Sequence, residues 1–172
     1  MNKYLLFLMT FVLFNCKEAE NDNPPMSLDN VQPEYITKAD AQAILGEAAH
    51  LTDSTMKNKK NAVEYNLTYV SDAVDVKTGK TGNIYYMFEQ YEHEAAANEV
   101  YDDIYKANAS HEGIKVLTGI GDEAYFHTDS ENFYFIMIRK GTKMIRMKVN
   151  KLTSLTSIDQ FNSIAKRIAD KL

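Results

Sequence analysis

The 172-residue chain predicts an α+β fold, with a mainly antiparallel sheet of about six strands and three helices. Three segments place apolar residues at helical spacing, at the start, the middle and the end of the folded part. Between them lie short segments that alternate apolar and polar residues, as half-buried strands do. The strands follow one another through short turns, which suit antiparallel neighbours. The predicted order is helix, two strands, helix, four strands and helix.

The folded part opens with a short helix in the stretch ITKADAQAILG, residues 36–46. Thr37 and Asp40 have the spacing of a capping box, and Gly46 can end the helix in a left-handed conformation. The polar, lysine-rich residues 47–61 follow this helix. We predict a loop there, with one short turn.

The next segments predict a hairpin and a helix. VEYNLTYV, residues 63–70, alternates strictly, and NIYYMFEQY, residues 83–91, supplies its partner strand. EHEAAANEVYDDIYKANA, residues 92–109, is typical of a helix, with acidic residues first and Lys106 near the end. Its expected apolar stripe consists of Ala97, Val100, Ile104 and Ala107.

The second half of the chain predicts four strands and a closing helix. IKVLTGIGDEAYFHT, residues 114–128, contains two short strands around a glycine turn. NFYFIMIRKGTKMIRMKVN, residues 132–150, is a hairpin that turns at Lys140-Gly141. SIDQFNSIAKRIADKL, residues 157–172, is an amphipathic helix that begins with a Ser157–Gln160 capping box. Its expected buried face consists of Ile158, Phe161, Ile164, Ala165, Ile168 and Leu172.

The strand FYFIMIR is apolar on both faces. One face takes Phe133, Phe135 and Met137, and the other takes Tyr134, Ile136 and Ile138. A strand with one solvent-exposed face would carry polar residues at alternate positions. We therefore expect the middle of the sheet to be covered on both sides, either by helices or by a helix layer and a bound ligand or partner.

The N-terminus has the features of a bacterial lipoprotein signal. Residues 1–15 contain Lys3 and an apolar run that spans only about half of a ~30 Å bilayer core, so they predict a signal peptide. The stretch from Leu13 to Cys16 resembles a lipobox, in which Phe14 and Asn15 are bulkier than the usual residues. The resemblance implies that the Cys16 thiol is acylated. The alternatives are an unusual cleavage boundary and a short buried helix.

The residues after Cys16 bear on location. Lys17, Glu18 and Glu20 resemble the surface-export signal of Bacteroidota lipoproteins, which implies an outer-membrane anchor and display on the cell surface. A periplasm-facing anchor is the alternative. Residues 16–35 hold all three prolines and few apolar side chains, which predicts a flexible tether. Residues 36–172 then form a single domain.

Composition excludes some classes of partner. The formal net charge is −5, which argues against nucleic acid and against adhesion of the domain to anionic headgroups. An acylated Cys16 would leave the mature chain without a thiol for catalysis or metal binding. No phosphate loop and no GxSxG elbow occurs, and no cofactor is predicted.

Two motifs and the closing helix resemble a known group. TKADAQAILG at 37–46 and GIGDEAYF at 119–126 resemble small bacterial lipoprotein domains of unknown function, whose architecture is similar to the α/β/α sandwich of PsbP- and Mog1-like proteins. The resemblance implies a binding or accessory role in the cell envelope and transfers no catalytic residue. From its own residues, GIGDEA predicts a tight turn in which Asp122 bonds to nearby amides.

Few residues stand out as candidates for a site. His93 and His111 are the metal-ligand candidates, but their spacing fits no known motif, so we interpret them as solvated side chains. Tyr85, Tyr91 and Tyr134 are candidates for a partner surface, because tyrosine combines contact area with a polar tip. The alternative is that these tyrosines cover the sheet beneath helices.

The sequence thus predicts a membrane-anchored envelope lipoprotein that acts as a binding or accessory module. An immunity or inhibitor protein is one subtype, since an acidic surface suits a basic partner. The alternatives are an envelope hydrolase whose site is assembled from distant residues, and a metal or haem carrier that uses His93 or His111.

Overall fold

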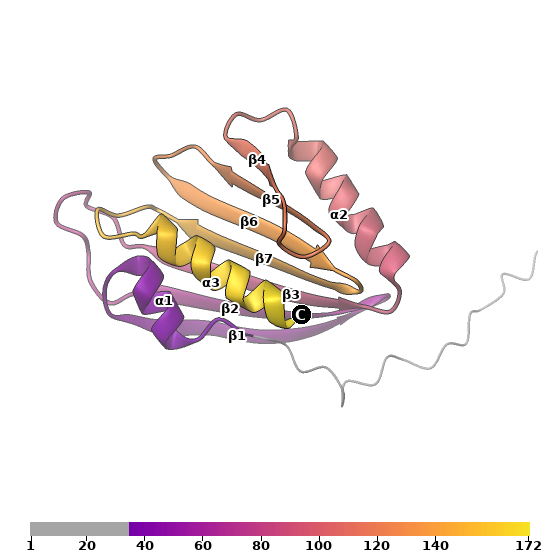
Figure 1. Ribbon diagram of the computed structural model, residues 1–172. Coiled ribbons are helices and arrows are strands. Elements are labelled where there is room, and N and C mark those ends of the chain that lie inside the picture. The colour runs from indigo at the N-terminus through magenta and orange to yellow at the C-terminus, as the bar shows by residue number, and fades with distance from the viewer. Residues whose placement is uncertain (1–34) are drawn as a thin grey trace, which may run out of the picture.

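Seven antiparallel strands form one open sheet in the order β1-β2-β3-β7-β6-β5-β4. The computed structural model describes residues 35–172 (Figure 1). The strands are β1 (Ala49–Lys59), β2 (Ala62–Ser71), β3 (Asn83–Tyr91), β4 (Ile114–Leu117), β5 (Glu123–Thr128), β6 (Phe133–Lys140) and β7 (Lys143–Asn150). The helices are α1 (Lys38–Leu45), α2 (Glu94–Asn108) and α3 (Ile158–Lys171). The predicted α+β class and antiparallel sheet are confirmed.

Helices lie against both faces of the sheet. Figure 1 shows α1 and α3 together, with α2 set apart from them. Ile136 and Ile138 point into the large core beneath α1 and α3, and Met137 points into the smaller core beneath α2. The two apolar faces predicted for β6 are therefore confirmed, and helices contribute to both layers.

The stretch predicted as a loop at residues 47–61 is largely a strand. β1 runs from Ala49 to Lys59, pairs with β2 and is irregular between Leu51 and Asp53. This prediction was wrong because an edge strand with both faces in water carries no apolar alternation. The sheet consequently has seven strands instead of about six, and the order is helix, three strands, helix, four strands and helix.

Most of the predicted helix ends and turns are confirmed. Thr37 Oγ1 accepts a hydrogen bond from the Asp40 amide at 3.1 Å, and Asp40 Oδ2 accepts one from the Thr37 amide at 2.9 Å. Gly46 ends α1 with φ 75°. Ala107 and Ile158, which were predicted in buried helix faces, are exposed. The reason is that each helix buries a narrower stripe than its apolar residues suggest. In the described residues, no helix is both long and apolar enough to cross a bilayer.

Candidate functional site

Two cavities open on the sheet face that α2 only partly covers. One, of about 230 Å³, lies over β2, β3, β6 and β7 and contains Tyr85 and Arg146 in its lining. The other, of about 370 Å³, lies between the sheet and the end of α2 and contains His111 and His127. Both are lined by Phe135 and Lys148, so they adjoin one another. We name the two cavities together the open-face groove.

The charge in the open-face groove is opposite to the charge of the chain. The sequence has 24 acidic residues, yet no aspartate or glutamate of the described residues lines either cavity. The charged side chains of the lining are instead Arg146 and Lys148. A concave, cationic lining of this kind attracts anions.

Aromatic rings supply the apolar part of the lining. Tyr85 is 44% exposed in the first cavity, and Phe135 is partly buried between the two. In the second cavity His127 packs edge-on against Phe133 at 4.9 Å between ring centroids. His111 stacks on His127 at 5.9 Å. The groove therefore offers flat apolar surfaces next to its positive charges.

A buried ionic network lies beside the first cavity. Glu64 on β2 and Glu89 on β3 are register partners, and both are buried. Lys59 forms ion pairs with both carboxylates. Burial disfavours the charge of Lys59, but its hydrogen bond to Glu64 and the nearby negative charges outweigh burial and raise the pKa of Lys59. The two carboxylates thus stabilise the charged form of Lys59.

Arg146 connects this network to the groove. Its guanidinium pairs with Glu89, so most of its charge is compensated within the protein. Its Nε, however, is buried and has no hydrogen-bond partner among the described residues. A buried donor without a partner costs free energy. The Arg146 side chain as a whole is 24% exposed and lines the first cavity.

Of the two cations that line the groove, Lys148 is the one without a carboxylate partner among the described residues. Its Nζ lies 5.1 Å from the centroid of the Phe133 ring and forms no ion pair within residues 35–172. Because Lys148 lines both cavities, its charge is available along the whole groove. An anion beside an apolar or aromatic group would meet complementary chemistry there.

The three tyrosines predicted for a partner surface do not form one surface. Tyr85 lines the open-face groove, whereas Tyr91 is buried in the core beneath α2. Tyr134 lies on the opposite face, where its ring packs 6.0 Å from that of Phe161. For Tyr91 and Tyr134 the structure favours the alternative that they cover the sheet beneath helices.

The histidine candidates are also separated. His93 precedes α2 and is exposed, whereas His111 follows the end of the same helix. In the part of the chain that the structure describes, no three His, Cys, Asp or Glu side chains are grouped to hold a metal ion. The predicted lipid and export residues Cys16, Lys17, Glu18 and Glu20 lie outside the described residues.

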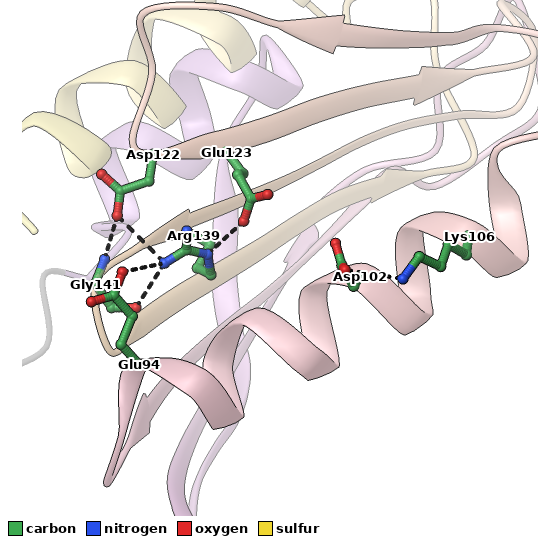
Figure 2. Close-up of polar contacts among 7 residues, drawn as sticks. All are labelled: Glu94, Asp102, Lys106, Asp122, Glu123, Arg139 and Gly141. Carbon is green, nitrogen blue, oxygen red and sulfur yellow. Dashed lines mark hydrogen bonds and ion pairs between the residues drawn. The ribbon is translucent and has the colours of Figure 1, made fainter.

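The GIGDEAYF motif forms the predicted tight turn and has a structural role (Figure 2). Arg139 is 6% exposed, and its guanidinium contacts the carboxylates of Glu94, Asp122 and Glu123. Asp122 Oδ2 also accepts a hydrogen bond from the Gly141 amide at 2.7 Å. These contacts join the β4–β5 turn, the β6–β7 turn and the start of α2.

A further cavity of about 420 Å³ next to this turn is acidic. Its carboxylates already have partners, since Glu123 binds Arg139 at 2.6 Å and Asp102 binds Lys106 at 3.0 Å. The burial of Arg139 opposes its charge, but the hydrogen bond and charge of Glu123 outweigh burial and raise the pKa of Arg139. The carboxylates of this cavity thus already have cationic partners within the protein.

Sequence reasoning missed Phe135, Arg146 and Lys148 as site residues. The cations alternate with Met147 in β7, so they share one face, but the sequence does not say whether a helix covers that face. Comparison with known proteins finds no family model, no curated protein and no solved structure that matches the chain. The resemblance to PsbP- and Mog1-like lipoprotein domains stays a prediction.

Proposed function

We propose that this protein is a membrane-anchored envelope lipoprotein whose domain binds a small organic anion in the open-face groove. The observation that carries the proposal is the lining of the two adjoining cavities, in which residues 35–172 place cations and aromatic rings but no carboxylate. The ligand class is a carboxylate or similar anion attached to a flat apolar body. Phe135 and Tyr85 would contact the body, and Lys148 the charge.

The size and electrostatics of the groove support this class of ligand. Cavities of about 230 and 370 Å³ are close to the lower end of typical small-molecule sites, roughly 300–1,000 Å³. Because the chain is acidic overall, most of its surface repels anions, and the groove is a local exception. The Arg146 side chain, which is 24% exposed, also lines the first cavity near Lys148.

Amide NMR of the purified protein tests where such a ligand binds. Titration with 2-naphthoate is expected to shift resonances of Tyr85, Phe135 and Lys148 and to leave those of α3 unchanged. Lys148→Gln is expected to abolish most of these shifts, whereas Lys166→Gln on α3 makes the same charge change away from the groove. Shifts spread over the whole surface, or shifts that Lys148→Gln does not affect, would refute the site.

The membrane anchor is a separate part of the proposal, and the lipobox residues support it. Mass spectrometry of the protein from native membranes is expected to find Cys16 as the first residue with acyl chains attached. A Cys16→Ala chain is expected to remain unacylated and to leave the membrane fraction. An unmodified Cys16 thiol in the membrane-bound wild-type protein would contradict the anchor without affecting the groove.

The other functions predicted from the sequence have less support. An immunity or inhibitor protein, an envelope hydrolase and a metal or haem carrier all stay predictions. For a carrier, His93 and His111 lie at opposite ends of α2, and a helix of that length separates them by about 20 Å.

A further inference from the structure

β1 is the long free edge of the sheet. It has 11 residues and, within residues 35–172, pairs only with β2, whereas the other edge strand, β4, has four. Every residue of β1 after Ala49 is exposed. A free edge presents a row of backbone donors and acceptors, so another strand can add to it.

The order of charges along β1 is self-complementary. Asp53 and Lys57 lie on either side of Thr55, and all three point to the same sheet face. In an antiparallel pair of two β1 strands about a two-fold axis at Thr55, Asp53 of each copy lies opposite Lys57 of the other. Opposite charges directly across two strands stabilise their pairing. We propose that a second copy of this chain pairs with β1 in this register.

Asp53 and Lys57 are available for this contact. Within residues 35–172 neither side chain forms an ion pair, and Glu64, the register partner of Lys57, is already bound by Lys59. A two-fold axis at Met56 would require Lys59 as the partner of Asp53, although Lys59 also binds Glu89. An axis at Asp53 or at Lys57 would place like charges opposite each other. The positions of these charges therefore favour a two-fold axis at Thr55.

The other face of β1 fits the same axis. A cavity of about 400 Å³ opens there, with Ser54, Met56 and Tyr65 in its lining. Met56 is 49% exposed, so strand pairing can remove a large apolar side chain from water. About an axis at Thr55, Ser54 of each copy lies opposite Met56 of the other. Each methionine would then cover the cavity beside the other copy's Ser54 and lose contact with water.

The two-fold axis is perpendicular to the sheet. This direction makes the two β1 strands antiparallel and leaves corresponding sheet faces of the two copies on the same side. The two sheets therefore become continuous, and the open-face grooves of the two copies lie on the same side. The dimer does not depend on what the groove binds, so its test needs no ligand.

A disulfide across the axis tests the register. Directly opposite residues of an antiparallel pair have Cα atoms about 4.5 or 5.5 Å apart, within the range that a disulfide spans. When full-length Thr55→Cys is oxidised in intact cells, we expect most of the protein to migrate as a covalent dimer on a non-reducing gel. The wild-type chain, whose single cysteine is Cys16, sets the background. A Thr55→Cys band no stronger than that background would overturn the proposal.

Two further cysteine variants distinguish this register from one that is shifted by a single residue. Ser54→Cys or Met56→Cys alone is expected to give only background, because neither residue lies opposite itself. Expressed together, the two variants are expected to cross-link with each other. Strong cross-linking of either variant alone would contradict the axis at Thr55.

Charge exchange tests the pairing without a covalent bond. Asp53→Lys and Lys57→Asp are each expected to lower the association constant about tenfold or more, and the double variant to restore it. Light scattering of the full-length protein in mild detergent measures the mass, and circular dichroism checks folding. A wild-type protein that remains monomeric at about 100 µM would refute the dimer, whatever association constants the variants have.

Discussion

Gly121→Ala is expected to destabilise the protein by about 2–5 kcal/mol, because it combines backbone strain with a clash. Gly121 has φ 61°, a conformation that residues with a Cβ rarely adopt. A Cβ at this position would lie 2.5 Å from the carbonyl oxygen of Arg139 and 2.7 Å from Ile138 Cγ2. Both neighbours belong to β6 beneath helices, so neither can move easily. Urea unfolding of the purified variant measures the loss.

Gly119→Ala is the matched control, since it lies two residues earlier in the same turn. Its φ of 75° is also left-handed, but no atom of the described residues lies within 4 Å of a Cβ there. We therefore expect only the backbone cost of about 1–2 kcal/mol. Equal losses in the two variants would show that the β4–β5 turn does not pack against β6 as described.

Glu89→Ala is expected to cost about 3 kcal/mol of stability, because it breaks a buried ionic network. Glu89 is 2% exposed and binds both Lys59 and Arg146. Without its carboxylate these two cations lie close to each other, with only Glu64 left to compensate them. The loss stays near the lower end of the range for buried pairs, since Lys59 is half-exposed and can be hydrated.

The control for Glu89 is another glutamate that pairs with an arginine. Glu94 contacts Arg139 at 3.3 Å, but its side chain is 64% exposed. Glu94→Ala is expected to cost at most about 1 kcal/mol, as exposed pairs do. Thermal or urea unfolding of both variants compares the costs. A Glu94→Ala loss as large as that of Glu89→Ala would mean that burial does not set the strength of these networks.

Local patterns were enough to predict most of the fold. The capping residue Thr37, the turn residue Gly141 and the alternating β2 strand all act through near neighbours in the chain, so their effects can be read from short segments. β1 was missed because its pairing with β2, and not any burial of its own side chains, makes it a strand. Such pairing leaves no periodic signal in the sequence.

The candidate site was largely hidden from the sequence. Arg146 and Glu89 are 57 residues apart, and only the β3–β7 pairing brings them together. The tyrosines show the same limit, because Tyr134 belongs to the face opposite Tyr85 once the strands are paired. A signal did exist in β7, where Arg146 and Lys148 alternate with buried residues. Whether these two cations are covered or open to a ligand depends on where α2 ends. Long-range packing determines that position.

Calorimetric titration with a matched pair of ligands tests the central claim most directly, namely that Lys148 recognises an anion in the open-face groove. The ligands are 2-naphthoate and its neutral amide, 2-naphthamide, each titrated into the wild-type protein and into Lys148→Gln. A hydrogen bond to a charged group contributes about 1.5–3 kcal/mol, so Lys148→Gln is expected to weaken naphthoate binding about tenfold or more. The affinity for naphthamide is expected to stay the same. Equal affinities of naphthoate for both proteins, or equal losses for both ligands, would contradict the account.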